Sequence, residues 1–209
     1  MRRIRNIQGS VAAALAVAAG LLAVTVGCAP VEEAEVSPPP APTVQPQPLN
    51  NDSLALLSQT ITPPASVSMP DLGIDMQIEP HGIDEVGQMS LPETPFVAAW
   101  YQYGSAPDSI QGATVLAAHV DDRELGIGPF SRLREAQPGM LVSVTDAAGV
   151  VHTYSVVNVE KIPKAEVPLD RVFTAVGDPQ LVLITCGGAF IEEIRNYTDN
   201  YIVTAEKVS

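Results

Sequence analysis

One cysteine, one histidine and one arginine have the side chains that covalent chemistry on a carbonyl group requires. Cys186 follows the apolar run Leu181–Thr185 and precedes two glycines, which leave room for another backbone to approach the thiol. His119 likewise follows the apolar run Ala113–Ala118, and Arg195 lies nine residues after Cys186. A thiolate is a nucleophile, an imidazole carries protons, and a guanidinium suits a carbonyl or a developing oxyanion.

Each of these residues also has an ordinary structural explanation. The thiol could be a buried, inert side chain, the histidine a hydrogen-bonded residue at a strand edge, and Arg195 an ion-pair partner of Glu192 or Glu193. Of the other histidines, His81 lies in a Pro-His-Gly turn and is predicted to be a solvated loop residue. His152 alternates with Val and Thr in a strand, which predicts a surface position. Sequence position alone leaves the choice between catalyst and structural residue open.

The elements that would position these residues are short and β-rich. Gly, Pro and Asp turn signals separate eight strand-forming runs, which are Ser66–Met69, Ile74–Glu79, Phe96–Tyr101, Thr114–Ala118, Leu141–Asp146, Val151–Lys161, Leu181–Thr185 and Tyr201–Lys207. Eight closely spaced runs predict an all-β sandwich or barrel, in which two strand ends could bring Cys186 and His119 to one rim. Helical signal is confined to one or two turns each at Phe130–Ala136 and Pro168–Val176.

The residues around the thiol resemble a known signature. Leu183-Ile184-Thr185-Cys186 fills four of the five positions of Thr-Leu-x-Thr-Cys, the sortase signature, with Val182 at the position of the first Thr. The longer pattern Leu-Ile-Thr-Cys-Gly-Gly-x-Phe, followed by Arg-x-Tyr-x-Asp-Asn from Arg195, is most similar to the actinobacterial class F sortases. His119 lies upstream in Ala-His-Val-Asp-Asp, where Ala118 replaces the Gly of many members. The resemblance spans about residues 65 to 208.

This resemblance implies a fold and a set of roles. The fold would be all-β, a closed eight-stranded sortase-type barrel with one or two short helices. Cys186 would be the nucleophile, His119 the acid and base, and Arg195 the group that holds the oxyanion. Thr185 would contact the substrate or support the cysteine.

The same resemblance implies the partners. The acyl donor would be a surface-protein sorting signal of Leu-Pro-x-Thr-Gly type, and the acceptor a peptidoglycan stem amine or water. Neither a cofactor nor a metal is expected, because Asp121-Asp122-x-Glu124 lacks the alternating spacing of a calcium loop and suits a solvated loop better. We expect a monomer.

The N-terminus predicts attachment to the outer face of a membrane. Arg2, Arg3 and Arg5 precede an uncharged apolar run over residues 11–29, which is typical of an export signal and is marginally long enough to span a bilayer. Cys28 ends a stretch that resembles a degenerate lipobox, so a lipid anchor through its sulfur, an uncleaved signal-anchor and full release after cleavage all remain open. The sequence thus divides into a signal or anchor segment (1–29), a proline-rich tether (30–64) and a catalytic barrel (65–209).

Charge and spacing restrict the other classes of protein. The chain has 24 acidic and 11 basic residues, with no Lys or Arg between Arg5 and Arg123, which argues against a nucleic-acid partner. An L,D-transpeptidase is a second cysteine-enzyme class, but its motif places an arginine two residues after the cysteine. A surface lipoprotein whose β-domain only binds is the non-enzymatic alternative.

Overall fold

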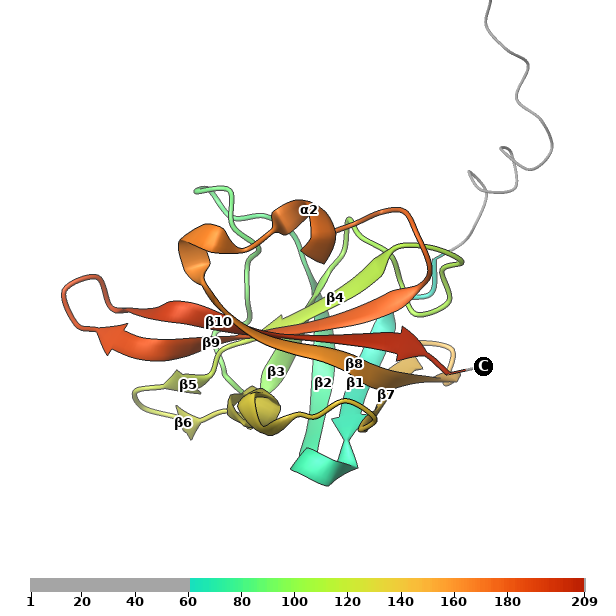
Figure 1. Cartoon of the computed structure of the whole chain (residues 1–209), viewed down its shortest axis with the longest axis horizontal. Helices are drawn as coiled ribbons and strands as arrows, with labels where there is room; N and C mark the ends of the chain where they lie inside the picture. The colour runs from blue at the N-terminus through green and yellow to red at the C-terminus, as the bar shows by residue number, and fades with distance from the viewer. Residues whose placement is uncertain (1–60, 209) are drawn as a thin grey trace, which may run out of the picture. The chain divides into compact units, whose positions relative to one another are not determined.

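The computed structural model describes residues 61–208, and eight of the strands close into a barrel (Figure 1). In chain order these are β1 (Pro64–Met69), β2 (Ile74–His81), β3 (Val97–Tyr101), β4 (Ala113–Ala118), β7 (Leu141–Asp146), β8 (Val151–Pro163), β9 (Gln180–Ile191) and β10 (Asn196–Lys207). The order around the barrel is β1-β2-β3-β4-β9-β10-β8-β7, and β7 pairs with β1 to close it. The predicted all-β, eight-stranded barrel is confirmed.

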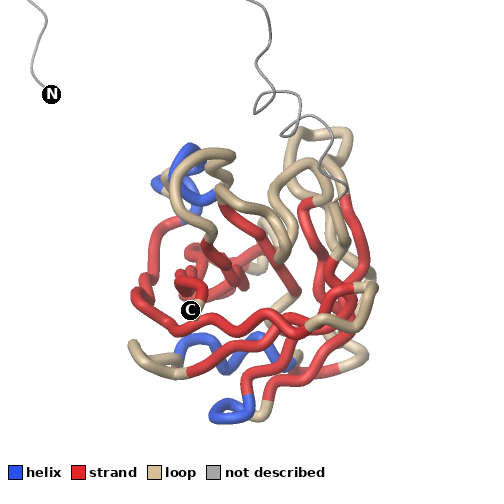
Figure 2. The backbone as a smooth tube through the Cα atoms, turned by 90° about the vertical axis from the view of Figure 1, so that its right-hand side faces the viewer, coloured by secondary structure: helices blue, strands red, loops and turns tan. Residues whose placement is uncertain are grey.

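Helices are few and short in the described part of the chain (Figure 2). The two predicted helical stretches become η2 (Pro129–Glu135), a 3-10 helix, and α2 (Leu169–Val172). Two further single turns are η1 (Pro70–Leu72) and η3 (Lys164–Glu166). The strands β5 (Asp121–Asp122) and β6 (Gly126–Ile127) form a separate small hairpin.

The last two strands are longer than the sequence suggested. Both β9 and β10 run past the barrel and pair with each other as far as Ile191 and Asn196, so they form a projecting hairpin (Figure 1). Cys186 therefore lies inside β9 rather than at its end. No sequence pattern predicts this extension. Most residues near its tip are exposed on both faces of the hairpin, so apolar residues are not required at alternate positions.

The strands that hold the site are buried on both faces. On β4, Leu116 and Ala118 belong to the core inside the barrel, whereas Val115 packs in a second cluster outside it. On β9, Leu183 lies in the inner core and Val182 in the outer cluster. The segment that carries η3 and α2 covers this outer cluster, which explains why both strands appear in the sequence as continuous apolar runs.

Two histidines lie in different environments from those predicted. His152 is not a surface residue: it is 9% exposed, and its Nε2 lies 2.8 Å from Oδ2 of buried Asp146. The tight turn that joins β7 to β8 brings this carboxylate beside the ring. His81 ends strand β2 rather than lying in a free loop, is half-buried, and its Nδ1 lies 3.3 Å from the Ser90 hydroxyl.

The predicted anchor segment, Cys28 and nearly all of the tether lie outside the described residues. Strand β1 begins at Pro64, the last residue of the predicted tether. Among residues 61–208, no helix has the length and apolar character that crossing a bilayer requires.

Candidate active site

Strand register brings Cys186 and His119 to the same groove. Strands β4 and β9 are parallel neighbours in which Ala118, the last residue of β4, pairs with Thr185, and the residues that follow this pair, His119 and Cys186, both line one groove. On β9, alternation directs Cys186 to the outer face of the barrel, after Val182 and Ile184. Both side chains are half-buried. The predicted meeting of the two strands at one rim therefore has a structural basis.

Thr185 ties the two strands together one step below the thiol. Its hydroxyl is buried and donates a 2.8 Å hydrogen bond to the carbonyl oxygen of Ala118, the residue before His119. This bond fixes the height of the histidine relative to the cysteine. Thr185 also lines a groove at the thiol, so its predicted contact with substrate remains a prediction.

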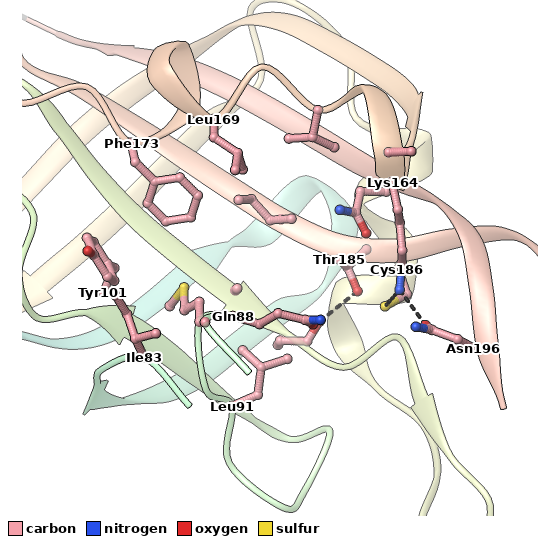
Figure 3. Close-up of a pocket in the computed structure, with 18 residues that line it drawn as sticks. Ile83, Gln88, Leu91, Tyr101, Lys164, Leu169, Phe173, Thr185, Cys186 and Asn196 are labelled. Atoms are coloured by element: carbon pink, nitrogen blue, oxygen red, sulfur yellow. Dashed lines mark hydrogen bonds between the residues drawn. The ribbon is translucent and has the colours of Figure 1, made fainter. Parts of the chain in front are cut away.

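Lys164 contacts the thiol, and no sequence pattern predicts this contact. Its Nζ donates to Sγ of Cys186 at 3.3 Å and to Oδ1 of Asn196 at 2.5 Å (Figure 3). Lys164 begins η3, directly after β8 ends. It is one of three lysines in the chain and belongs to no local motif, so only the pairing of β8, β10 and β9 reveals the contact.

Arg195 lies at the tip of the β9–β10 hairpin. Its backbone has φ of +49°, a left-handed conformation that a hairpin turn requires, and its side chain is exposed. The ion pair suggested for it does not form: within the described residues, Glu192 instead pairs with Arg123 at 3.8 Å. Arg195 and Cys186 both line one groove, and the predicted role of Arg195 at the oxyanion remains a prediction.

A phenol and a carboxylate connect the hairpin to the segment that follows His119. The Tyr197 hydroxyl donates a 2.5 Å hydrogen bond to Asp121. This bond, followed by burial and the charge of Asp121, raises the pKa of Tyr197 to about 12, so the phenol stays protonated at neutral pH. The neighbouring Asp122 accepts backbone N–H groups from Leu125 and Glu124, which lower the pKa of its carboxyl group. The sequence predicted a solvated loop for this acidic stretch; in the structure Asp121 and Asp122 form the short strand β5, and Asp122 bonds to the turn that follows it.

Cys186 lines two large grooves and a smaller one. One large groove, of about 670 Å³, is largely apolar and runs toward α2. Figure 3 shows Tyr101, Leu169 and Phe173 at its far end, with Lys164, Cys186 and Asn196 at the near end. The other large groove, of about 760 Å³, has polar and acidic walls that include His119, Asp121, Glu192 and Arg195.

A β-barrel whose neighbouring parallel strands present a cysteine and a histidine beside a groove defines a class of cysteine enzyme. The sortase domain model matches residues 67–208, more than half of the chain. The protein therefore belongs to the sortase family and is a cysteine transpeptidase.

Solved structures agree with this assignment in fold. Sortase A of Corynebacterium diphtheriae, solved as a lid mutant, superposes with a TM-score of 0.54 at 18% identity over 76% of each chain. Sortase C2 of pilus island 1 from Group B Streptococcus gives 0.53 at 18% identity, covering 77% of this chain and 81% of its own. A Clostridium perfringens sortase D5 transpeptidase gives 0.53 at 14% identity, covering 76% and 88%. A comparison with curated proteins finds no match.

Proposed function

We propose that this sortase cleaves a sorting signal of Leu-Pro-x-Thr-Gly type through a thioester on Cys186 and transfers the acyl group to an amine of the cell wall. The observation that supports the proposal is that His119 and Cys186, which follow the last residue pair of β4 and β9, line the same groove. A nucleophile with a proton carrier next to it is the minimum that acyl transfer requires.

The chemistry follows from these two side chains. The Cys186 thiolate attacks the carbonyl carbon of the Thr–Gly bond, and the C–N bond breaks while the His119 imidazolium gives its proton to the departing amine. The acyl group is now held as a thioester. An incoming amine attacks that carbonyl, gives a proton to the neutral His119, and the C–S bond breaks to restore the thiolate. The guanidinium of Arg195 would hold the peptide backbone or the oxyanion while the carbonyl is tetrahedral.

The two grooves suit the two substrates. The apolar groove offers Leu169, Phe173 and Ile184 to the Leu-Pro part of a donor peptide, and the thiol lies at its end. The polar groove, which also reaches the thiol, has acidic walls, which attract a protonated amine before it loses its proton. Donor and acceptor would therefore approach Cys186 through different grooves.

We also propose that the enzyme works as a monomer on the outer face of the cell membrane, held by its N-terminus, and that it belongs to class F. The support is in the sequence: the basic start, the apolar run over residues 11–29, and the Arg-x-Tyr-x-Asp-Asn pattern after the thiol. An intact mass of the detergent-extracted native protein separates the anchors. A diacylated chain starting at Cys28 indicates a lipoprotein, and a chain retaining residues 1–27 indicates a signal-anchor.

The full chain in detergent, mixed with a fluorogenic Leu-Pro-x-Thr-Gly peptide, tests the donor. We expect cleavage between Thr and Gly, and, when an amine such as a wall stem peptide is added, a ligated product in place of the free acid. A peptide with the same residues in scrambled order is the control. Equal cleavage of both peptides, or cleavage of neither, would contradict the proposed donor.

A further inference from the structure

Lys164, the first residue of η3, brings a positive charge next to the thiol of Cys186. Nζ of Lys164 lies 3.3 Å from Sγ of Cys186, within hydrogen-bonding distance for sulfur. The lysine is half-buried, and its other partner is the neutral amide of Asn196. Within residues 61–208 no carboxylate pairs with it, whereas Lys161, three residues earlier, pairs with Asp199 at 3.1 Å. The charge of Lys164 is therefore directed at the thiol.

The barrel itself fixes this contact. In the β10 ladder, Asn200 pairs with Cys186 of β9 on one side and with Ile162 of β8 on the other. Cys186, Asn200 and Ile162 are therefore aligned across the three neighbouring strands, which brings the end of β8 close to the thiol. Lys164 begins the 3-10 turn two residues beyond Ile162, and Asn196 from the hairpin holds its ammonium group from the opposite side. Three separate elements converge on the ammonium position.

A cation at this distance has a defined chemical effect. The thiolate, not the thiol, attacks the carbonyl carbon, and a neighbouring lysine ammonium favours the thiolate by charge and by hydrogen bonding. His119, which directly follows β4, lines a groove with the same thiol, but in the proposed cycle it must exchange its proton twice. A permanent charge on Lys164 would keep the thiolate populated while the histidine is neutral. The other charged or titratable groups that line the grooves at the thiol are Asp84, Tyr101, Asp121, Asp122, Arg123, Arg134, Lys161, Glu192, Arg195, Tyr197 and Tyr201.

We propose that Lys164 is a catalytic residue of this enzyme, whose ammonium group stabilises the Cys186 thiolate, and that Asn196 is its positioning residue. The inference rests on the proposed role of Cys186 as the nucleophile. It makes no use of the identity of the peptide, so it can be tested without a substrate.

The pH dependence of Cys186 alkylation tests the proposal. The full chain carries Cys28→Ser, which leaves Cys186 as its one thiol, and iodoacetamide labelling is followed by intact mass from pH 5 to pH 10. Adding Lys164→Gln is expected to raise the midpoint of this profile by about one pH unit, which lowers the labelling rate at pH 7 by about tenfold. Lys164→Arg, which keeps a cation, is expected to restore most of the rate.

Lys207→Gln is the matched control, because it removes the same charge from a lysine that bonds to the Pro107 carbonyl rather than to the thiol. Its midpoint should equal that of the Cys28→Ser chain. If Lys164→Gln does not fold, Asn196→Ala provides the second test, with a smaller shift in the same direction expected. An unchanged midpoint in the folded Lys164→Gln variant, or in Asn196→Ala where that variant is used, would overturn the proposal. Failure to cleave a Leu-Pro-x-Thr-Gly peptide would leave this result unaffected and would count against the proposed donor instead.

Discussion

A pair of polar side chains lies at each end of strand β8, and the two pairs differ in their exposure to solvent. Near its start, His152 bonds to the Asp146 carboxylate at 2.8 Å, and Asp146 also accepts the backbone N–H groups of Ala148 and Val150. Just beyond its end, Lys164 contacts the half-buried thiol of Cys186. Both ends thus contain a cation-forming side chain beside an anion-forming one.

The difference lies in what remains available to another molecule. At the β7–β8 turn, the histidine and its carboxylate are 9% and 4% exposed, so the pair can serve the fold alone. At the rim, His119 has no hydrogen-bond partner within the described residues and lines a groove with the thiol. The role of a histidine therefore depends on the partner that the fold supplies, not on its residue type alone. Changes at the rim should alter turnover, and changes at the turn should alter stability.

Among the groove residues other than the nucleophile Cys186 and the proton carrier His119, Arg195 should give the largest effect. Replacing it by Ala is expected to reduce kcat/KM for peptide cleavage about 100-fold, the usual cost of one oxyanion donor. Arg195→Lys should be nearly as damaging, because an ammonium lacks the planar fork of a guanidinium. Arg171→Lys, at an arginine that pairs with Glu160, is the control and should keep wild-type activity. Near-normal activity of Arg195→Lys would mean that charge alone matters.

Leu169 tests whether the apolar groove binds the donor. Its side chain is 63% exposed and lines that groove, so Leu169→Ala removes apolar contact area with little cost to the core. We expect KM for the donor peptide to rise about fivefold with kcat nearly unchanged, in line with the loss of about 1 kcal/mol of apolar contact. Val151→Ala, at a residue that is 58% exposed and lies outside both grooves, should change neither constant. An unchanged KM in Leu169→Ala would place the donor elsewhere.

Asp146 tests the opposite end. The hydrogen bond from His152, helped by backbone N–H groups and opposed by desolvation, holds the pKa of the Asp146 carboxyl below its ordinary value of 3.8. Because the folded-state pKa is depressed, this stabilisation is complete above about pH 4 and is lost as the pH falls below that range.

Asp146→Asn should therefore lower Tm by about 3 °C at pH 7 and by less at pH 3, with kcat/KM of the folded enzyme unchanged. Differential scanning calorimetry at the two pH values and the peptide assay measure both quantities. A Tm difference that stays the same from pH 7 to pH 3 would show that the charge of Asp146 is not what stabilises the turn.

Local patterns in the sequence predict most of the barrel, because buried strands need apolar residues at regular spacing. They place Cys186 and His119 after neighbouring apolar runs, and the structure shows those runs paired in parallel. The β9–β10 extension has no such pattern because it projects from the core.

Long-range pairing explains what the sequence could not show. Lys164 reaches Cys186, 22 residues away, through the register of three strands, and no motif encodes that register. The burial of His152 was easier to predict from the sequence. Asp146 lies six residues earlier, across a short Gly-containing turn, and this spacing allows its carboxylate to contact the imidazole ring.

An intact mass of the enzyme during turnover tests the central claim most directly. The full chain is mixed with a Leu-Pro-x-Thr-Gly peptide, quenched in acid and measured. We expect a species heavier by the acyl fragment up to Thr, attached at Cys186, released by hydroxylamine and absent from Cys186→Ala, whose far-ultraviolet circular dichroism should match wild type. Peptide cleavage by folded Cys186→Ala above a few per cent of wild type, or an acyl adduct on another residue, would contradict a thioester on Cys186 as the carrier of the reaction.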